Sequence, residues 1–248
     1  MNSPFSLEGK NILVTGASSG IGRAVAVACA EMGANIVLTA RNEQRLNETL
    51  SLMSSKNHTK IIADLTDFQQ ITQLVENLPK LDGFVSIAGI AKTLVANLAE
   101  NQDIEEVFRA NTFSAISLTQ QLIQQKKLNK NASLVYISSI SGVKIGYVGG
   151  GLYGASKAAL EGFIKGTALE LAPRGIRLNT VVPAMIETPL LAHSEISQEQ
   201  LAEDAKRYPL KRYGKSEEVA YAAVYLLSDA TQWITGTSLL IDGGYTLN

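Results

Sequence analysis

Cysteine is almost absent from this chain, which limits the chemistry that it can carry. The one cysteine, Cys29, has no partner for an internal disulfide and lies in an Ala- and Val-rich segment with helical periodicity. We therefore interpret it as a buried, unreactive thiol, because a reactive cysteine needs a polar and partly exposed environment. We expect no metal site.

Long apolar runs and a strong charge of one sign are also missing. No apolar stretch approaches the ~18 residues that a membrane span needs, and the start, MNSPFSLEGK, lacks a basic segment followed by an apolar one. The formal net charge of −1 argues against a general polyanion binder. We therefore expect a cytoplasmic protein that binds neither membranes nor nucleic acid.

Linkers, internal repeats and low-complexity segments are absent as well. A chain of 248 residues with 46% hydrophobic residues is long enough to bury a sizeable core. We expect one domain that covers residues 1–248.

Short β-branched segments alternate with segments of helical periodicity along the chain. Most of them are almost continuously apolar, which is typical of parallel strands covered by helices on both faces. This pattern predicts an α/β fold, a doubly wound seven-stranded parallel sheet, whose ligands bind at the carboxyl ends of the strands. The expected strands are residues 11–15, 35–39, 60–63, 83–87, 133–138, 176–182 and 238–242.

The first expected strand ends in VTGASSGIGRAVA. Gly16, Gly20 and Gly22 allow a sharp turn and a close approach of the backbone to a ligand, and the helix that follows offers free N–H groups to a pyrophosphate. The spacing is GxxxGxG instead of the common GxGxxG, but the strand before it and the helix after it favour a dinucleotide site over a turn that binds nothing.

Arg41 follows the second expected strand, where NAD-binding proteins of this architecture carry an acidic residue. A guanidinium there suits a ribose 2′-phosphate, so we expect NADP(H) to be favoured over NAD(H). Asp64, after the third strand, is either an acceptor for the adenine amino group or the N-cap of the next helix.

Four motifs occur in order: TGASSGIG, Ser139 in ISSISG, YGASK and IDGGY. In these motifs the chain resembles the short-chain dehydrogenase/reductase family, in the family's compact single-domain form. The resemblance extends over essentially the whole chain. Within the family it is most similar to 3-oxoacyl-acyl carrier protein reductases, which would place it in fatty acid biosynthesis.

The resemblance implies a catalytic set of Ser139, Tyr153, Lys157 and Asn111. Tyr153 and Lys157 are four residues apart, so they lie on one face of a helix, and a neighbouring ammonium would lower the pKa of the phenol. Tyr153 would give its proton to a carbonyl oxygen that the Ser139 hydroxyl holds. By family resemblance, Lys157 would also hold the nicotinamide ribose, and Asn111 would support a water that links the lysine to solvent.

The resemblance also implies a set of cofactor-binding residues. Where the family has Asn-Asn-Ala-Gly, this chain has Ser86, Ile87, Ala88 and Gly89, and Ala184 replaces the glycine after Pro183. The segment between Ser139 and Tyr153 is one residue longer than in many relatives, which leaves Ser141 as a possible substitute for Ser139. The expected cofactor residues are Gly16, Ser18, Ser19, Gly20, Ile21, Gly22, Arg41, Asp64, Leu65, Ala88, Gly89, Tyr153, Lys157, Pro183, Ile186 and Thr188.

Substrate recognition is expected in residues 185–214, which resemble the family's lid of short helices. His193 is either a substrate contact or an exposed lid residue, and Met185 and Tyr147 either line the pocket or pack ordinarily. Lys130 and Arg174 stand where carrier-protein reductases have basic residues, so an acyl carrier protein is a candidate partner, with Lys126 and Lys127 alongside. By resemblance we also expect a homo-oligomer, a tetramer or a dimer built through the helices of Asn111 and Tyr153.

The function that this sequence predicts is an NADP(H)-dependent reduction of a carbonyl, of the 3-oxoacyl thioester kind, to a secondary alcohol. A sugar, a steroid or another small ketone is the alternative substrate, and a dinucleotide-binding module without catalysis is the alternative class. The tyrosine of related enoyl reductases would fall at position 150, which is Gly150, so carbonyl reduction is preferred over reduction of a carbon–carbon double bond.

Overall fold

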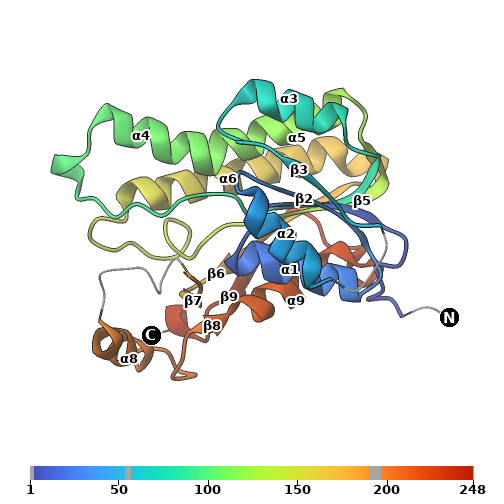
Figure 1. Cartoon of the computed structure of the whole chain (residues 1–248). Helices are drawn as coiled ribbons and strands as arrows, with labels where there is room; N and C mark the ends of the chain where they lie inside the picture. Colours follow the sequence, from blue (N-terminus) through green and yellow to red (C-terminus); the bar gives the residue numbers. More distant parts are fainter. Residues whose placement is uncertain (1–2, 54–56, 190–196, 248) are drawn as a thin grey trace.

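A parallel sheet of seven strands forms the centre of the molecule, which confirms the predicted fold class (Figure 1). The computed structural model describes residues 3–53, 57–189 and 197–247. The strand order is β3-β2-β1-β4-β5-β6-β9, so the chain reverses direction across the sheet between β1 and β4. The strands are β1 (Asn11–Thr15), β2 (Asn35–Ala40), β3 (Thr59–Ile62), β4 (Leu81–Ser86), β5 (Leu128–Ile137), β6 (Arg177–Pro183) and β9 (Ser238–Ile241).

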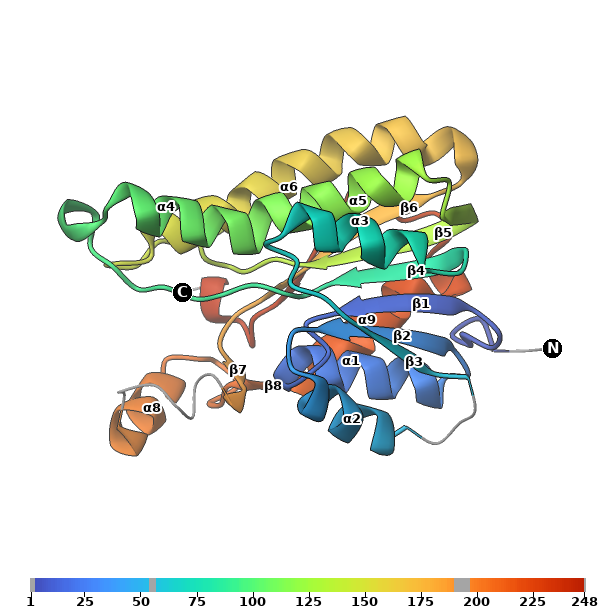
Figure 2. The same cartoon turned by 45° about the horizontal axis from the view of Figure 1, so that its top comes forward.

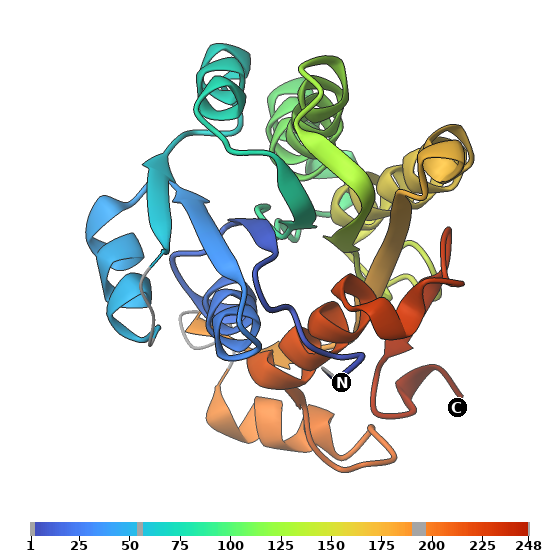
Figure 3. The same ribbon diagram turned by 90° about the vertical axis from the view of Figure 1, so that its right-hand side faces the viewer.

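Helices cover both faces of this sheet, as Figures 2 and 3 show. Side chains alternate between the faces along each strand: Ile12 and Val14 join one buried cluster and Leu13 joins the other. This explains why the strands are apolar along their whole length. The first cluster packs under α1 (Gly20–Glu31), α2 (Glu43–Ser51) and α9 (Ser216–Leu227), and the second under α3 (Phe68–Glu76), α5 (Ser114–Gln124) and α6 (Gly151–Leu171).

Strand β5 begins five residues before the predicted start at residue 133. Its first residue, Leu128, pairs with Leu81, and the register then shifts before Gly83 pairs with Ser133. Asn131 has a φ of 63° inside this irregular stretch. The polar residues of the stretch show no apolar pattern, so the extension of the strand could not be predicted from the sequence.

The helix that carries Asn111 contains a π-helical segment (Arg109–Phe113) between α4 (Asn101–Phe108) and α5. Such a segment breaks the regular i→i+4 ladder and often marks a functional position. Short 3₁₀ segments lie at Ala96–Leu98, Ala172–Arg174, Asp229–Thr231 and Tyr245–Leu247.

The predicted lid, residues 185–214, contains small elements beyond the carboxyl end of β6. Strands β7 (Ile186–Glu187) and β8 (Gly214–Lys215) pair with each other, and α8 (Gln198–Ala205) lies between them in the chain. His193 falls within residues 190–196, which lie outside the described residues.

None of the helices in the described ranges is long and apolar enough to cross a membrane.

Candidate active site

A cavity of about 610 Å³ opens at the carboxyl ends of β1, β2, β3 and β4. Helix α1 points its N-terminus toward this end of the sheet, with no side chain bonded to its first N–H groups and no acidic residue in its first turn. A Cβ at Gly22 would overlap the Gly16 carbonyl oxygen, so the close turn requires glycine. The residues predicted to bind cofactor that line the cavity are Gly16, Ser18, Ser19, Arg41, Asp64, Leu65, Ala88 and Gly89.

Two arginines face this cavity, Arg41 and Arg45. Among the described residues neither has an acidic partner, whereas the nearby Arg23 forms an ion pair with Glu48 over 2.8 Å. The sequence reasoning missed Arg45. It could have been found as a second arginine one helical turn after Arg41. The Asn42 side chain caps the helix of Arg45 by accepting a hydrogen bond from the Arg45 N–H.

Asp64 lines the cavity but is not the N-cap of α3, so that alternative was wrong. Its Oδ1 accepts hydrogen bonds from the Thr66 N–H (2.9 Å) and hydroxyl (2.8 Å). Asp67 caps α3 by accepting bonds from the N–H groups of Gln69 and Gln70. The two aspartates are three residues apart, and only the turn geometry distinguishes them.

The backbone of the β4 loop is held by Thr15 at the end of β1. The Thr15 hydroxyl accepts hydrogen bonds from the N–H groups of Ile87 (2.9 Å) and Ala88 (3.2 Å). This places Ala88 and Gly89 at the cavity wall, although the family's two asparagines are replaced here by Ser86 and Ile87.

Tyr153, in the first turn of α6, lies close enough to Ser139, which follows β5, for the serine side chain to affect the pKa of its phenol. The Ser139 oxygen also accepts a bond from the Ser141 N–H over 3.1 Å. Of the two serines that the sequence left open, Ser139 is the one that affects the pKa of the tyrosine. Burial raises the pKa of the Tyr153 phenol, and the Ser139 side chain acts in the opposite direction.

Lys157 lies one turn further along α6 and is buried. Its Nζ donates a hydrogen bond to the Ile137 carbonyl oxygen over 2.9 Å and lies 6.0 Å from the centre of the Tyr153 ring. Burial lowers the pKa of its amine to about 8. A Cβ placed on Gly89 would lie 3.7 Å from the Lys157 Nζ, so the lysine adjoins the cavity wall.

The Asn111 side chain is fully engaged with protein atoms. Its Oδ1 accepts a bond from the Ile90 N–H over 2.7 Å, and its Nδ2 donates to the Ile90 carbonyl oxygen (2.9 Å) and to the Ser156 hydroxyl (3.0 Å). Ser156 in turn donates to the Tyr153 carbonyl oxygen over 2.7 Å. Asn111 thus joins the β4 loop to the helix of Tyr153. Ser156 is a second residue that the sequence reasoning missed.

The remaining predicted cofactor residues are not among those that line the cavity, and Ile186 lines a second cavity together with Met185 and Tyr208. Thr188 is close to Gly20, because a Cβ on that glycine would meet the threonine side chain at 3.5 Å. The Pro183 carbonyl accepts a bond from the Ile140 N–H over 3.0 Å, next to Ser139. Ile21 and Gly22 belong to the first turn of α1, and Ile186 to β7.

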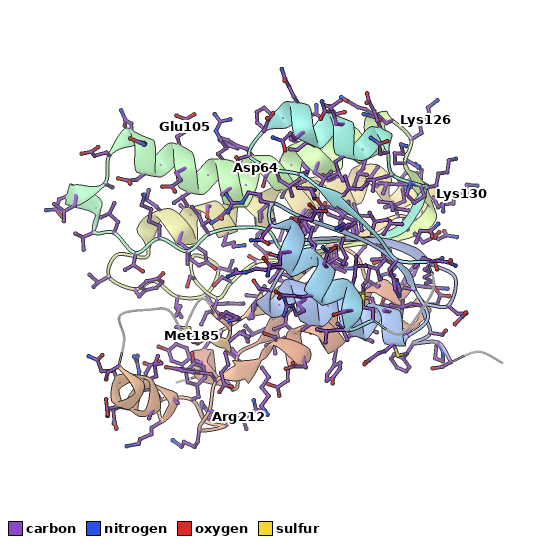
Figure 4. The ribbon with its side chains drawn as sticks, viewed as in Figure 1. Asp64, Glu105, Lys126, Lys130, Met185 and Arg212 are labelled. Carbon is purple, nitrogen blue, oxygen red and sulfur yellow. The ribbon has the colours of Figure 1, made fainter. Side chains whose placement is uncertain are left out.

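The basic residues singled out as carrier-protein contacts lie at the other end of the sheet. Figure 4 shows Lys126 and Lys130 together, far from Met185. Arg174 follows the C-terminus of α6, and a helix rises 1.5 Å per residue, so it lies about 30 Å from Tyr153 along the axis. Lys127 and Arg174 both donate bonds to backbone carbonyls there.

In the described part of the chain no group of three or more His, Cys, Asp or Glu side chains could hold a metal ion.

The chain is similar to known proteins along nearly its whole length. A family model described as enoyl-(acyl carrier protein) reductase matches residues 16–246. The 3-oxoacyl-acyl carrier protein reductase of Rickettsia conorii is 33% identical over 240 residues, which cover 97% of this chain and 98% of the relative.

Two solved structures share the fold over nearly their whole length. A short-chain dehydrogenase/reductase from Brucella melitensis, described as a glucose/ribitol dehydrogenase, is 30% identical with a TM-score of 0.90, covering 97% of this chain and 98% of the other. A protein assigned as a 2-deoxy-D-gluconate 3-dehydrogenase from Agrobacterium tumefaciens, with bound NADP, is 30% identical with a TM-score of 0.90 over 100% of both chains. The chain belongs to the short-chain dehydrogenase/reductase family and is an NAD(P)-dependent oxidoreductase that acts on a carbonyl or an alcohol.

Proposed function

We propose that this protein uses NADPH to reduce the ketone of a 3-oxoacyl thioester to a secondary alcohol. The observation that carries the proposal is the group of Ser139, Tyr153 and the buried Lys157, whose Nζ lies 6.0 Å from the centre of the Tyr153 ring and adjoins the cavity that Gly89 lines. A module that only binds a dinucleotide has no use for such a group of side chains.

The residues of the cavity fit a dinucleotide phosphate. The closely packed glycines and the uncapped N-terminus of α1 suit the pyrophosphate, and Arg41 and Arg45 suit a 2′-phosphate. When bound, NADPH would supply the hydride that the carbonyl carbon accepts.

The proton comes from the protein. The Ser139 hydroxyl donates a hydrogen bond to the substrate carbonyl oxygen, and Tyr153 gives that oxygen its proton, which leaves an alcohol and a phenolate. Lys157 is mainly protonated below pH 8, and its positive charge near the Tyr153 ring favours the phenolate. Asn111 and Ser156 hold the backbone of this helix in place.

The substrate class is supported by the relatives named as 3-oxoacyl-acyl carrier protein reductases, while other relatives carry names of sugar dehydrogenases. The matching family model is described as an enoyl reductase, but the chain has Gly150 where the tyrosine of that reaction would stand.

The test is a panel of carbonyl compounds with NADPH: 3-oxoacyl thioesters, sugars and steroid ketones, followed by nicotinamide absorbance. We expect the thioesters to be reduced fastest. Tyr153→Phe removes only the hydroxyl and should lower kcat by about 10²–10⁴-fold, as loss of a general acid does. NADPH binding without turnover of any carbonyl would favour the non-catalytic module instead.

The preference for NADPH is tested separately by binding. Arg41→Ala and Arg45→Ala should each weaken NADPH by roughly 10-fold or more, since a hydrogen bond to a charged group contributes about 1.5–3 kcal/mol, and leave NADH nearly unchanged. Arg109→Ala is the control, because Arg109 pairs with Glu105 on α4. An equal loss for both cofactors would contradict the 2′-phosphate role.

An acyl carrier protein as the natural donor of the thioester is part of the proposal. Within one chain, Lys126, Lys130 and Arg174 lie at the end of the sheet opposite Tyr153. We therefore suggest comparing carrier-bound and carrier-free 3-oxoacyl thioesters in the wild type and in Lys130→Glu. If the carrier protein docks on these basic residues, the Lys130→Glu variant should lose activity only on the carrier-bound substrate.

A further inference from the structure

A second phenol, that of Tyr147, lies next to Tyr153. The Tyr147 ring packs directly on the Cα of Gly150, where any Cβ would overlap it. Gly150 is three residues before Tyr153, and residues three apart on a helix share a face, with Cβ positions about 5–6 Å apart. The two phenols are also close enough for Tyr147 to contribute to the raised pKa of Tyr153.

Backbone hydrogen bonds anchor the loop that carries this ring. The Gly150 N–H donates to the Tyr147 carbonyl oxygen over 2.9 Å, and the Leu94 N–H donates to the Gly149 carbonyl oxygen over 2.9 Å. Gly149 has a φ of 82° and lies against the Thr93 side chain. The loop is therefore anchored both on itself and on the segment that follows the β4 loop.

The Tyr147 side chain is nevertheless available to a ligand. It is 44% exposed, and among the described residues its hydroxyl has no hydrogen-bond partner. An anchored ring with a free hydroxyl beside the proton donor is arranged to meet a part of the substrate close to the reacting ketone.

We propose that the Tyr147 hydroxyl donates a hydrogen bond to the second carbonyl of a 1,3-dicarbonyl substrate, while Tyr153 gives its proton to the ketone oxygen. In a 3-oxoacyl thioester that second carbonyl lies two carbons from the ketone and can only accept hydrogen bonds, which a phenol O–H satisfies. This inference rests on the proposed carbonyl reduction and names the chemical feature that the site selects.

The experiment compares two substrates that differ in one group. The first is the acetoacetyl thioester of N-acetylcysteamine, and the second is the ketone in which a methylene replaces the thioester carbonyl. Tyr147→Phe should lower kcat/KM for the thioester by roughly 3- to 10-fold, the effect of one neutral hydrogen bond, and leave the thioether ketone unchanged within about 2-fold. Val148→Ala, at the exposed neighbouring residue, is the control and should alter neither substrate.

The outcomes separate this inference from the proposed function. If the wild type reduces neither compound, nor any member of the carbonyl panel, the proposed reduction fails. If the wild type reduces the thioether ketone but not the thioester, or if Tyr147→Phe affects both substrates alike or neither, the role of Tyr147 is wrong while carbonyl reduction stands. The Kd of NADPH, measured by fluorescence, should be the same in Tyr147→Phe and wild type.

Discussion

Lys157 is a buried amine whose only hydrogen bond in the described structure goes to the Ile137 carbonyl, and burying it destabilises the fold. Its pKa falls from 10.5 to about 8, so between these pH values the unfolded chain binds more protons here than the folded chain does. The destabilisation is complete below pH 8 and fades as the pH rises toward 10.5. The shift corresponds to about 3 kcal/mol at the usual conversion of pKa to free energy.

Lys157→Met should therefore be more stable than the wild type at pH 7, because the methionine carries no charge into the interior. We expect this difference in the free energy of unfolding to shrink by about 3 kcal/mol between pH 7 and pH 10.5. Urea denaturation of the cofactor-free protein across that range measures it. Lys165→Met, on the exposed side of the same helix, is the control, and a difference for Lys157→Met that does not change with pH would refute the prediction.

For these single residues, the sequence predicted that Tyr153 and Lys157 lie on one helix face but not that burial shifts the pKa of both. The spacing of Tyr153 and Lys157 places both on one face of α6, as expected. The expected lowering of the Tyr153 pKa is not seen in this structure, because burial raises it. Burial depends on the loops that cover a residue, and neither a four-residue spacing nor the residue type records those loops.

The contact that positions Ser139 relative to Tyr153 is made between elements, by Gly142 and Gly154. Gly142 has a φ of 80°, and a Cβ there would overlap the Gly154 carbonyl oxygen in the first turn of α6. The Gly142 N–H also donates to the Ile145 carbonyl oxygen over 2.8 Å, which closes the loop that follows Ser139. The loop can lie this close to the helix because Gly142 lacks a side chain, and a Cβ on Gly154 would also be crowded, 3.1 Å from the Gly142 nitrogen.

Gly142→Ala should therefore destabilise the protein by about 1–3 kcal/mol, the cost of a strained backbone at a crowded position, and should lower kcat by moving Ser139 away from Tyr153. Gly146→Ala is the matched control in the same loop, since its φ is not positive and no atom lies within 4 Å of its Cβ position. Unfolding midpoints and turnover should separate the two variants. Equal behaviour would show that the Gly142 contact does not hold the site.

Elements with a repeating apolar pattern were predictable, and those made by side-chain networks were not. The seven strands of the sheet were all expected from continuous apolar runs, with most of their ends correct within two residues. The π-helical segment around Asn111 could not be predicted from the sequence. It accompanies hydrogen bonds between Asn111 and two residues that are distant in sequence, Ile90 and Ser156. The extra residue between Ser139 and Tyr153 did not indicate that Gly142 lies against the first turn of α6.

For the whole molecule, the helices that carry Asn111 and Tyr153 present apolar side chains to solvent. Figure 2 shows α4, α5 and α6 side by side over one face of the sheet. Leu169 on α6 is 79% exposed, and Ile104 and Phe113 on the neighbouring helices are also exposed. Large apolar side chains that stay exposed on a helix can bury their area against another protein. The resemblance to the family implies that identical copies assemble through these helices.

We expect the protein to form a homo-oligomer at micromolar concentration and Leu169→Glu to shift it toward smaller species, because a buried unpaired carboxylate at the contact is costly. Sedimentation velocity measures both forms. Leu52→Glu is the matched control: Leu52 follows α2, on the other face of the sheet, and is also an exposed leucine. A monomeric wild type, or a Leu169→Glu variant that sediments like the wild type, would refute assembly through these helices. If the assembly also stabilises the fold, the wild-type unfolding midpoint should rise with protein concentration while that of Leu169→Glu stays constant.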